Sequence, residues 1–423
     1  MTEAEIAGLG PAFAAYLRRY RTHIDHDGTA RHFDTYCRGL LSDLPRKSVE
    51  PIALAGGTAV RTLQMFLAAS QWDHDSARTT LQRYLGEIVA GLPADRLGTV
   101  GVIHETSCRK WGDQTPGVQR QYLGCEGKVE NGIVTVHVGV AKGTFQALLD
   151  ADLYLPESWS DDRERCRAAG IPDAKEYQPK WQLAYEQLCR LRDNGVSFDW
   201  LTFDEGYGAA VPLLRLLNAD GQRFVAEIPI NFAVRDTPEG PSRRADARLP
   251  GAAARGGTRH RIGHQTIAPS YWRATSVRVW VADRVHLLVV AINEATAEVK
   301  YFLTNATTAS MTRILGVAFR RWTIEQGFRL GKQEAGLMDY EGRSYVGLVR
   351  HLVLALIVLG FVATQTERLR GEKSPGDGRA GVSGVERAVC DAVPPASGRG
   401  RRAARGRSDP LPPATQRRGR PVA

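Results

Sequence analysis

Cysteine is scarce in this sequence, and the few cysteines form no pattern that builds a metal site or a disulfide framework. Six occur among 423 residues, at Cys37, Cys108, Cys125, Cys166, Cys189 and Cys390. No two of them have the C-x-x-C spacing that structural zinc sites use. Scattered thiols of this kind are typical of reducing compartments, so zinc knuckles and disulfide-stapled secreted domains are excluded.

Long hydrophobic runs are also missing. The longest apolar stretch runs from Leu352 to Ala363, well short of the roughly 20 residues that span a bilayer. The first ten residues, MTEAEIAGLG, lack the basic and then apolar layout of a secretion signal. We therefore expect a soluble intracellular protein without a membrane partner, in which 352–363 belongs to a buried helix.

Negative charge is in deficit, with 46 Asp or Glu against 56 Lys or Arg and a formal net charge of +10. This balance favours polyanionic partners. Much of the excess lies in 371–423, which holds eleven Lys or Arg against five Asp or Glu. Gly, Pro, Ala and Arg dominate there, so 369–423 is predicted to be a disordered basic tail. It is either a basic arm on DNA or an extension without function.

The rest of the chain divides into a helical part and an α/β part. Residues 1–95 have helical spacing and recurrent basic residues, which predict a helical N-terminal domain. Its basic faces either dock on DNA phosphates or are ordinary solvated surface. From residue 96 to 368 strand and helix patterns alternate, which predicts an α/β fold. Strands are expected within 100–103, 133–141, 147–155, 198–203, 224–230, 277–281, 286–293 and 299–303, and helices over 180–194, 212–218, 311–331 and 345–364. Residues 231–270, rich in Gly, Arg and Pro, are expected to be an irregular insertion.

Asp204 stands out by its position. It follows the apolar run Trp200–Phe203 and precedes the glycine-rich turn Glu205–Gly208. Ligands of α/β sheets bind at the carboxyl ends of the strands, which is where such an aspartate lies. The alternative is a turn or helix-cap aspartate, which the position alone favours.

Glu325 lies in the helical stretch RRWTIEQGFRLGKQE. Arg321, Glu325 and Lys332 recur at spacings that place them on one helix face. On such a face the glutamate suits a metal ion, and the cations suit phosphate oxygens. The alternative is an ordinary surface pair between Arg321 and Glu325.

Several longer blocks carry a family resemblance. They are Thr115–Ala141, Leu148–Trp159, the FDEGYG segment Phe203–Gly208, and the R-x3-E-x6-K spacing of Arg321, Glu325 and Lys332. Together they resemble insertion-sequence transposases of the DDE superfamily, from about Phe33 to Ala363. In the fuller signature a tyrosine lies three residues before the arginine, and Ala318 stands there in this chain.

The resemblance implies an RNase H-like catalytic core over 96–368. Three carboxylates converge in that fold: one on the first strand, one after the fourth strand and one on a late helix. A β-rich insertion precedes the late helix and corresponds to about 231–305. Asp204 and Glu325 match the second and third carboxylates.

The first carboxylate has no clean match. The family pattern is Asp, then Asp or Glu, then Thr, whereas this chain has Ile103-His104-Glu105-Thr106. Neighbours on a strand point to opposite faces, so without a bulge only one of the pair enters the site. Either Glu105 supplies the carboxylate, or His104 binds the metal through nitrogen, or the site is damaged. Mg²⁺ prefers oxygen and favours Glu105, while imidazole suits Mn²⁺ or Zn²⁺ better.

We therefore predict Glu105, Asp204 and Glu325 as catalytic carboxylates, with His104 as a further metal ligand and Mg²⁺, or alternatively Mn²⁺, as the cofactor. The resemblance implies DNA cleavage and strand transfer at terminal inverted repeats. The partners would be double-stranded DNA, as transposon ends and target, and a second copy of the chain in a synaptic complex. The location would be the cytoplasm of a prokaryote, at the nucleoid. Predicted DNA contacts are Arg321, Lys332, Tyr207 and Arg120. The alternative function is a catalytically impaired or domesticated DNA-binding protein derived from a transposase.

Overall fold

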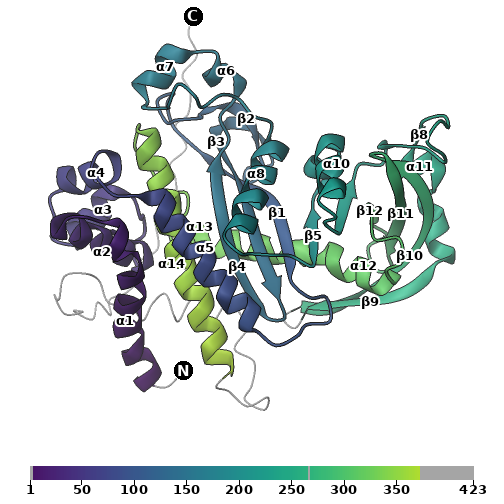
Figure 1. Cartoon of the computed structure of the whole chain (residues 1–423), viewed down its shortest axis with the longest axis horizontal. Helices are drawn as coiled ribbons and strands as arrows, with labels where there is room; N and C mark the ends of the chain where they lie inside the picture. The colour runs from purple at the N-terminus through teal and green to yellow at the C-terminus, as the bar shows by residue number, and fades with distance from the viewer. Residues whose placement is uncertain (1–2, 265–266, 372–423) are drawn as a thin grey trace, which may run out of the picture.

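The computed structural model describes residues 3–264 and 267–371 (Figure 1). Helices open the chain, a large sheet follows, and helices close the described part. The first helices are α1 (Glu3–Leu17), η1 (Arg18–His23), α2 (Asp27–Leu41), α3 (Val49–Ala55), α4 (Val60–Ala68) and α5 (His74–Gly91). The predicted basic tail, 369–423, lies almost wholly outside the described residues. The last helix ends at Gly371 and so includes the first residues that were assigned to the tail.

Ten strands and their connecting helices occupy the middle of the chain up to residue 281. They are β1 (Val100–Arg109), β2 (Gln119–Leu123), β3 (Lys128–Lys142), β4 (Phe145–Leu153), α6 (Glu157–Ser160), α7 (Arg163–Ala168), α8 (Lys180–Asp193), β5 (Trp200–Phe203), α9 (Glu205–Gly208), α10 (Val211–Ala219), β6 (Phe224–Ile228), β7 (Ala233–Val234), β8 (Arg243–Arg244), α11 (Ala245–Arg248), η2 (Gly251–Gly256), β9 (Thr258–His264) and β10 (Ile267–Val281). The remaining elements are β11 (Arg284–Asn293), β12 (Val299–Thr304), α12 (Met311–Ala318), η3 (Phe319–Arg321), α13 (Trp322–Glu334) and α14 (Tyr345–Gly371).

Ten strands form one mixed sheet in the order β2-β3-β1-β5-β6-β12-β11-β10-β9, with β4 also paired to β3. The pairs β1–β5 and β5–β6 are parallel, and the other pairs are antiparallel. All four residues of β5 are buried, as expected for a parallel strand with both faces covered. The molecule is therefore a mixed α/β fold built on one large mixed sheet.

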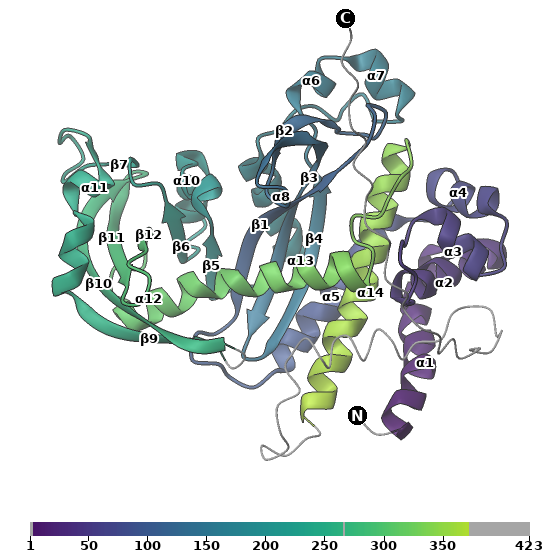
Figure 2. The same cartoon turned by 180° about the vertical axis from the view of Figure 1, so that it is seen from behind.

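Helices cover this sheet on both faces. Figure 2 shows α13 crossing β1, β3 and β4 on one face, while α8 and α10 lie on the face turned toward the viewer in Figure 1. A continuous hydrophobic core reaches from Leu9 in α1 to Leu369 in α14. The N-terminal helices thus share their core with the sheet, because α14 packs against α2, α4, α5 and β4.

The segment 231–270 is more regular than the sequence predicts. It contains β7 and β8, the short helices α11 and η2, all of β9 and the start of β10. Strands β9 to β12 then continue the main sheet, because β12 pairs with β6 over Tyr301–Thr304 and Val225–Ile228. The prediction of an irregular insertion over 231–270 was therefore wrong. The polar composition of this segment is that of strands with one exposed face.

The prediction of a single helix over 311–331 was also wrong. The structure breaks it into α12 and α13 at the 3-10 turn η3. The Thr323 hydroxyl donates to the Arg320 carbonyl at 2.7 Å, and this carbonyl would otherwise accept the next helical hydrogen bond. Such a side-chain bond competes with the helix and bends it. The ring of Phe319 packs 4.7 Å from that of Trp272 and holds the turn against β10.

Helix α14 is longer than the predicted 345–364. By length and composition it is the one helix among the described residues that could cross a membrane, yet 83% of its most apolar window is buried inside the protein. That burial is what a central core helix requires. Its His351 accepts a hydrogen bond at Nδ1 from the Tyr36 hydroxyl at 2.9 Å, and Nε2 donates to the Gly336 carbonyl at 2.9 Å.

A buried ionic cluster joins three elements. On β4, Asp150 and Asp152 each contact Arg190 of α8, at 2.8 and 2.6 Å. Arg78 of α5 lies 3.3 Å from Asp152 and 3.6 Å from Asp150. Burial would raise the pKa of Asp152, but Arg190 and then Arg78 lower it well below its usual range. Removing one partner of such a cluster leaves a buried charge and costs on the order of 3–5 kcal/mol.

The buried histidines predict a loss of stability in mild acid. Burial lowers the pKa of His137 to about 3 and those of His286 and His351 to about 4. Between pH 4 and the ordinary histidine pKa of about 6.5, the unfolded chain binds more protons than the folded one. The free energy of unfolding therefore falls as the pH is lowered from 7 to 5, by about 2 kcal/mol for each such histidine.

Urea unfolding of wild type and His351→Gln at pH 7 and pH 5 tests this. The glutamine variant should lose about 2 kcal/mol less than wild type between the two pH values. Tyr36→Phe is the matched control, because it removes the same hydrogen bond without removing a titrating group. An equal pH dependence in wild type and His351→Gln would contradict the assignment.

Candidate active site

The pleat of β1 places His104 and Glu105 on opposite faces of the sheet. The strand pairs with β3 without a bulge, with His104 opposite His137 and Glu105 opposite Val136. Successive side chains of a regular strand alternate between faces. Only one member of the pair can therefore meet Asp204, which follows the neighbouring parallel strand β5.

That member is His104. Its Nδ1 lies 3.0 Å from Oδ2 of Asp204, and its Nε2 lies 3.8 Å from Oε1 of Glu325. Asp204 is also the N-cap of α9, because its Oδ1 accepts from the backbone nitrogens of Gly206 and Tyr207 at 3.0 and 3.4 Å. The helix-cap alternative is thus real, but it occupies only one carboxylate oxygen and leaves the other facing His104.

Gly208 lets this turn approach the next strand. A Cβ at Gly208 would lie 1.9 Å from the backbone oxygen of Glu227 in β6. A larger residue would therefore push α9, and with it Asp204, away from the sheet edge. The second glycine of FDEGYG is therefore required by the close packing of α9 on β6, which only the three-dimensional structure shows.

Glu325 reaches the site from α13 and is held by Arg321. The Arg321 Nη1 lies 2.7 Å from Glu325 Oε1, one helical turn away, and its Nε lies 3.6 Å from Oε2 of Glu227. Lys300 of β12 lies 2.6 Å from the other oxygen of Glu227. Positive and negative side chains thus alternate from Lys300 through Glu227, Arg321 and Glu325 to the His104 site.

The pKa of Asp204 is lowered. Burial alone would raise it, and the contacts with His104, followed by the charge of Arg321, outweigh burial. Asp204 is therefore ionised at neutral pH, and its contribution to stability is present above the ordinary aspartate pKa and lost as the pH falls through its lower folded value. A carboxylate kept ionised beside an imidazole is suited to bind a cation or to hold a proton on the ring.

Glu105 is not brought to this site. Both of its carboxylate oxygens lie 2.9 Å from the ammonium group of Lys180 in α8, on the other face of β1. Tyr207 is buried as well, with only 2% of its surface exposed, and burial raises the pKa of its hydroxyl, with Glu105 and Asp204 adding to the effect. Its ring does not stand free to stack on DNA.

The other predicted DNA contacts, Lys332 and Arg120, lie farther from His104. Lys332 of α13 donates to the Ser107 carbonyl on β1 at 2.9 Å, and burial lowers its pKa. Arg120 is exposed on the edge strand β2, opposite Asn131. Because Gly132 of β3 pairs with Arg109, Arg120 lies near the far end of β1 and away from His104. Of the predicted DNA contacts, only Arg321 lies directly at the carboxylates.

A cavity of about 260 Å³ adjoins the site on the side of the antiparallel strands. Its lining includes Arg321 and Glu325 together with the aromatic side chains of Trp272 and Phe302. Glu227 and Lys300 had not been predicted as site residues, although Glu227 is the one charged residue of the strand FVAEI. A lone carboxylate in an otherwise apolar strand was the signal that could have found it.

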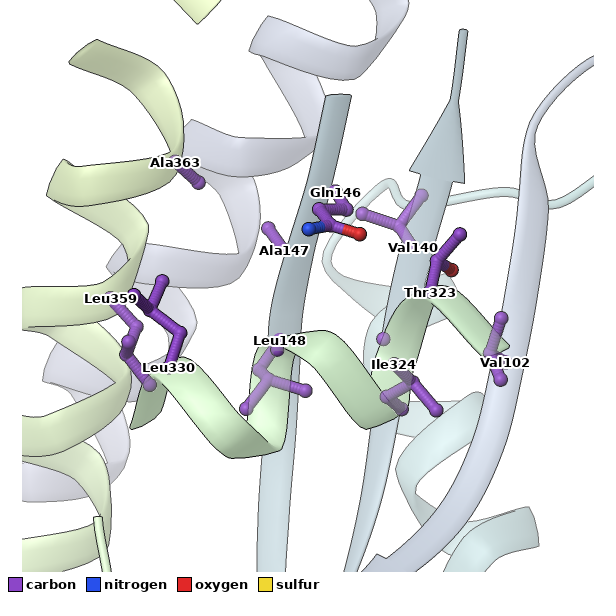
Figure 3. A pocket seen from close by; sticks show the side chains of 12 residues that line it. Val102, Val140, Gln146, Ala147, Leu148, Thr323, Ile324, Leu330, Leu359 and Ala363 are labelled. Atoms are coloured by element: carbon purple, nitrogen blue, oxygen red, sulfur yellow. The ribbon is translucent and has the colours of Figure 1, made fainter. Parts of the chain in front are cut away.

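A second, smaller cavity of about 30 Å³ lies behind α13. Figure 3 shows Ile324 and Leu330 of the helix turned toward Val102, Leu148 and Leu359, which come from β1, β4 and α14. The helix that carries Glu325 therefore packs on the sheet with a small void under it. Gly327 lines this void.

The donor set suits a single divalent cation that accepts nitrogen. His104, Asp204 and Glu325 offer one imidazole and two carboxylates, and Nδ1 of His104 already faces Oδ2 of Asp204 at 3.0 Å. Mn²⁺ and Zn²⁺ accept such mixed ligands, whereas Mg²⁺ prefers oxygen alone. No three His, Cys, Asp or Glu side chains of residues 3–264 and 267–371 are already arranged as a ligand set, so Glu325 would have to turn from Arg321 to complete it.

The chain belongs to the DDE superfamily endonucleases, whose sequence profile matches residues 19–284. A curated relative is the probable transposase for insertion sequence element IS701 of Microchaete diplosiphon, which is 32% identical over 202 residues. The match spans 46% of this chain and 46% of that protein, so the chain covers about half the length of its relative. These findings confirm the predicted DDE-type insertion-sequence resemblance.

The cryo-EM structure of the piggyBac transposase synaptic complex with hairpin DNA aligns with 86% of this chain and 70% of its own. The TM-score is 0.43 and the sequence identity is 10%.

The void behind α13 predicts a stabilising substitution. A Cβ at Gly327 would lie 3.8 Å from Leu148, which is ordinary van der Waals contact. Gly327→Ala should raise the free energy of unfolding by about 0.5–1 kcal/mol, from helix propensity and reduced unfolded-state entropy. Gly331→Ala is the matched control, because its Cβ would lie 3.1 Å from Leu337 and 3.2 Å from Leu359. Urea unfolding should show a smaller gain, or a loss, for Gly331→Ala; equal gains would contradict this packing.

Proposed function

We propose that this protein is a transposase that cleaves DNA at the terminal inverted repeats of an insertion sequence and transfers the ends to a target. The observation that carries the proposal is the convergence of Asp204 and Glu325, 121 positions apart in the sequence, on the same imidazole of His104. Membership of the DDE superfamily endonucleases supports DNA as the substrate.

The strand order supports an RNase H-like core. The five strands β4-β3-β1-β5-β6 are adjacent, with β1, β5 and β6 parallel and β3 antiparallel to its neighbours. The three candidate positions lie on β1, after β5 and on α13, which is the arrangement that the resemblance implies. Because β2 is an additional edge strand, β5 is the fourth strand of this core.

The residues of the chain divide the work of phosphodiester cleavage. Asp204 and Glu325, with His104, would hold the divalent ion, which when bound activates the attacking oxygen and neutralises the leaving oxygen. Arg321 is placed to contact a phosphate oxygen once it releases Glu325, because a guanidinium fork matches phosphate as well as carboxylate. The N-cap bonds of Asp204 keep its free oxygen aimed at the site.

His104 sets the metal preference in this proposal. It replaces one of three carboxylates, so the site carries one negative charge fewer and one nitrogen donor more. We infer that Mn²⁺ supports the reaction better than Mg²⁺. Glu105, which is paired with Lys180, then supports the strand from the opposite face without binding the ion.

A second candidate function follows from the same histidine. An imidazole 3.0 Å from Asp204 and 3.8 Å from Glu325 can neutralise the acidic pair when protonated, and this would leave a DNA-binding protein without cleavage. The two functions differ in one result, which is metal-dependent cutting of the element's own ends.

The proposed organisation follows the order of the elements. The helices within 1–95 would form the DNA-binding part, 96–368 the catalytic domain with its β-rich insertion over about 231–305, and 369–423 a basic tail. DNA ends and target would be held by two copies of the chain, at the nucleoid of a prokaryotic cell.

Cleavage of a labelled duplex that carries the element's terminal repeat tests the function. With Mn²⁺, wild type should nick the end, and Asp204→Asn or Glu325→Gln should lower the rate by at least about 100-fold, because each removes a charge that only the transition state fully uses. Glu105→Gln is the matched control and should keep most of the activity. No cutting by wild type with either Mn²⁺ or Mg²⁺ would favour the DNA-binding alternative, and equal cutting of random DNA would indicate a nuclease without end specificity.

We expect the substitution His104→Asp to shift the metal preference from Mn²⁺ toward Mg²⁺. The variant restores three oxygen donors, so the ratio of the Mg²⁺-supported rate to the Mn²⁺-supported rate should rise by about tenfold or more. Mn²⁺ binding can also be measured directly, from the electron paramagnetic resonance signal of the ion, and this readout does not need turnover. An unchanged ratio together with unchanged Mn²⁺ binding would show that His104 does not contact the ion.

A further inference from the structure

One exposed face of the β9–β10 pair carries a cluster of arginines that the proposed chemistry does not use. Arg259 and Arg261 lie two residues apart on β9, directly opposite Arg273 and Tyr271 of β10. Residues paired in this way project from the same face of a sheet. We call these four residues the arginine face.

The arginine face is open to solvent and positively charged. The side chains of Arg259 and Arg273 are 54% and 42% exposed, and both contact Glu294, at 2.8 and 3.1 Å. The Arg261 side chain makes no ion pair or hydrogen bond with any described residue. Three guanidinium groups therefore stand against one carboxylate.

Tyr271 gives this face a fixed shape. Its ring lies 3.9 Å from the guanidinium carbon of Arg259, and 37% of the residue is exposed. Stacking holds the guanidinium flat, and the nitrogens that do not bind Glu294 are left to donate. Arg259 and Arg261 are about 7 Å apart along the strand, which is close to two base-pair steps of about 3.4 Å in a duplex.

The opposite face of the same strand pair belongs to the active-site side. His260 lies 3.1 Å from the Thr312 hydroxyl of α12, and Trp272 packs on Phe319. Ile262 and Trp272 line the 260 Å³ cavity that Glu325 also lines. The strand pair is therefore a wall with the carboxylate site on one side and the arginine face on the other.

We propose that the arginine face binds the phosphate backbone of a second DNA duplex, distinct from the duplex that is cut at His104, Asp204 and Glu325. A duplex is too stiff to fold around a wall one strand layer thick within a few base pairs. DNA held at the carboxylates therefore cannot reach the arginine face with the same segment. This inference rests on the proposed function for the first duplex. The second is identified by charge complementarity between the guanidinium groups of the arginine face and DNA phosphates.

The test uses the full chain and two duplexes with different dyes. A terminal-repeat duplex is bound first at equimolar concentration, and a random-sequence duplex is then titrated while its anisotropy is followed at 50–200 mM NaCl. The variant R259A/R261A/R273A should bind the second duplex about tenfold or more weakly, and the slope of log K against log salt should become shallower by about 2 to 3. Its affinity for the first duplex should stay within about twofold of wild type.

The matched control is R192A/R215A/R244A, which removes the same charge. Its three arginines are more than half exposed and are paired with one aspartate each, Asp220, Asp283 and Asp246. It should bind the second duplex like wild type, and thermal unfolding should show that both variants fold.

Three outcomes overturn the inference. Equal loss of both duplexes in the arginine-face variant would assign this face to the cut DNA. Unchanged DNA binding with loss of self-association in sedimentation would assign it to an acidic protein surface. Binding of only one duplex by wild type would remove the second site. Failure of the proposed function would give a different result: the protein would bind two duplexes but would not cleave DNA with a divalent metal ion.

Discussion

The alternation of side chains along β1 is the constraint on which the site depends. Because β1 pairs with β3 in an unbroken register from Val100 to Arg109, His104 and Glu105 must face opposite sides. The side that faces Asp204 and α13 receives the imidazole, and the side that faces α8 receives the carboxylate, where Lys180 neutralises it. A bulge of one residue would exchange the two, so the backbone register decides which of these side chains faces Asp204.

Charges of opposite sign then hold the remaining groups in place. Glu227 and Glu325 would repel each other across the same cavity, and Arg321 lies between them with a contact to each. Lys300 balances the second oxygen of Glu227. Because Arg321 is shared, a phosphate that takes over its guanidinium also frees Glu325. In the proposed function, substrate binding and assembly of the acidic ligands would therefore be coupled through one side chain.

The sequence was informative where patterns are local. Short apolar runs predicted β5 and β6, and a change of composition marked the tail. Strand ends and helix spacing made Asp204 and Glu325 candidates, and the family resemblance assigned them. It failed where contacts between distant segments decide. The break before Trp322 depends on the Thr323 hydroxyl and on Trp272, the place of Glu105 depends on Lys180, and the burial of Tyr207 depends on how closely α9 approaches β6. Of these contacts, only the bond of Thr323 to Arg320 is local in the sequence.

The position of the antiparallel strands explains why they and the site form one unit. Strand β12 extends the sheet from β6, so β9 to β12 are fixed to the same backbone that carries Asp204 through β5. The chain returns from β12 through α12, and Phe319 packs on Trp272 of β10 where the helix bends. That bend sets the direction of α13 and hence the reach of Glu325. A change in the packing of β10 on η3 therefore acts on the carboxylate geometry without touching a carboxylate.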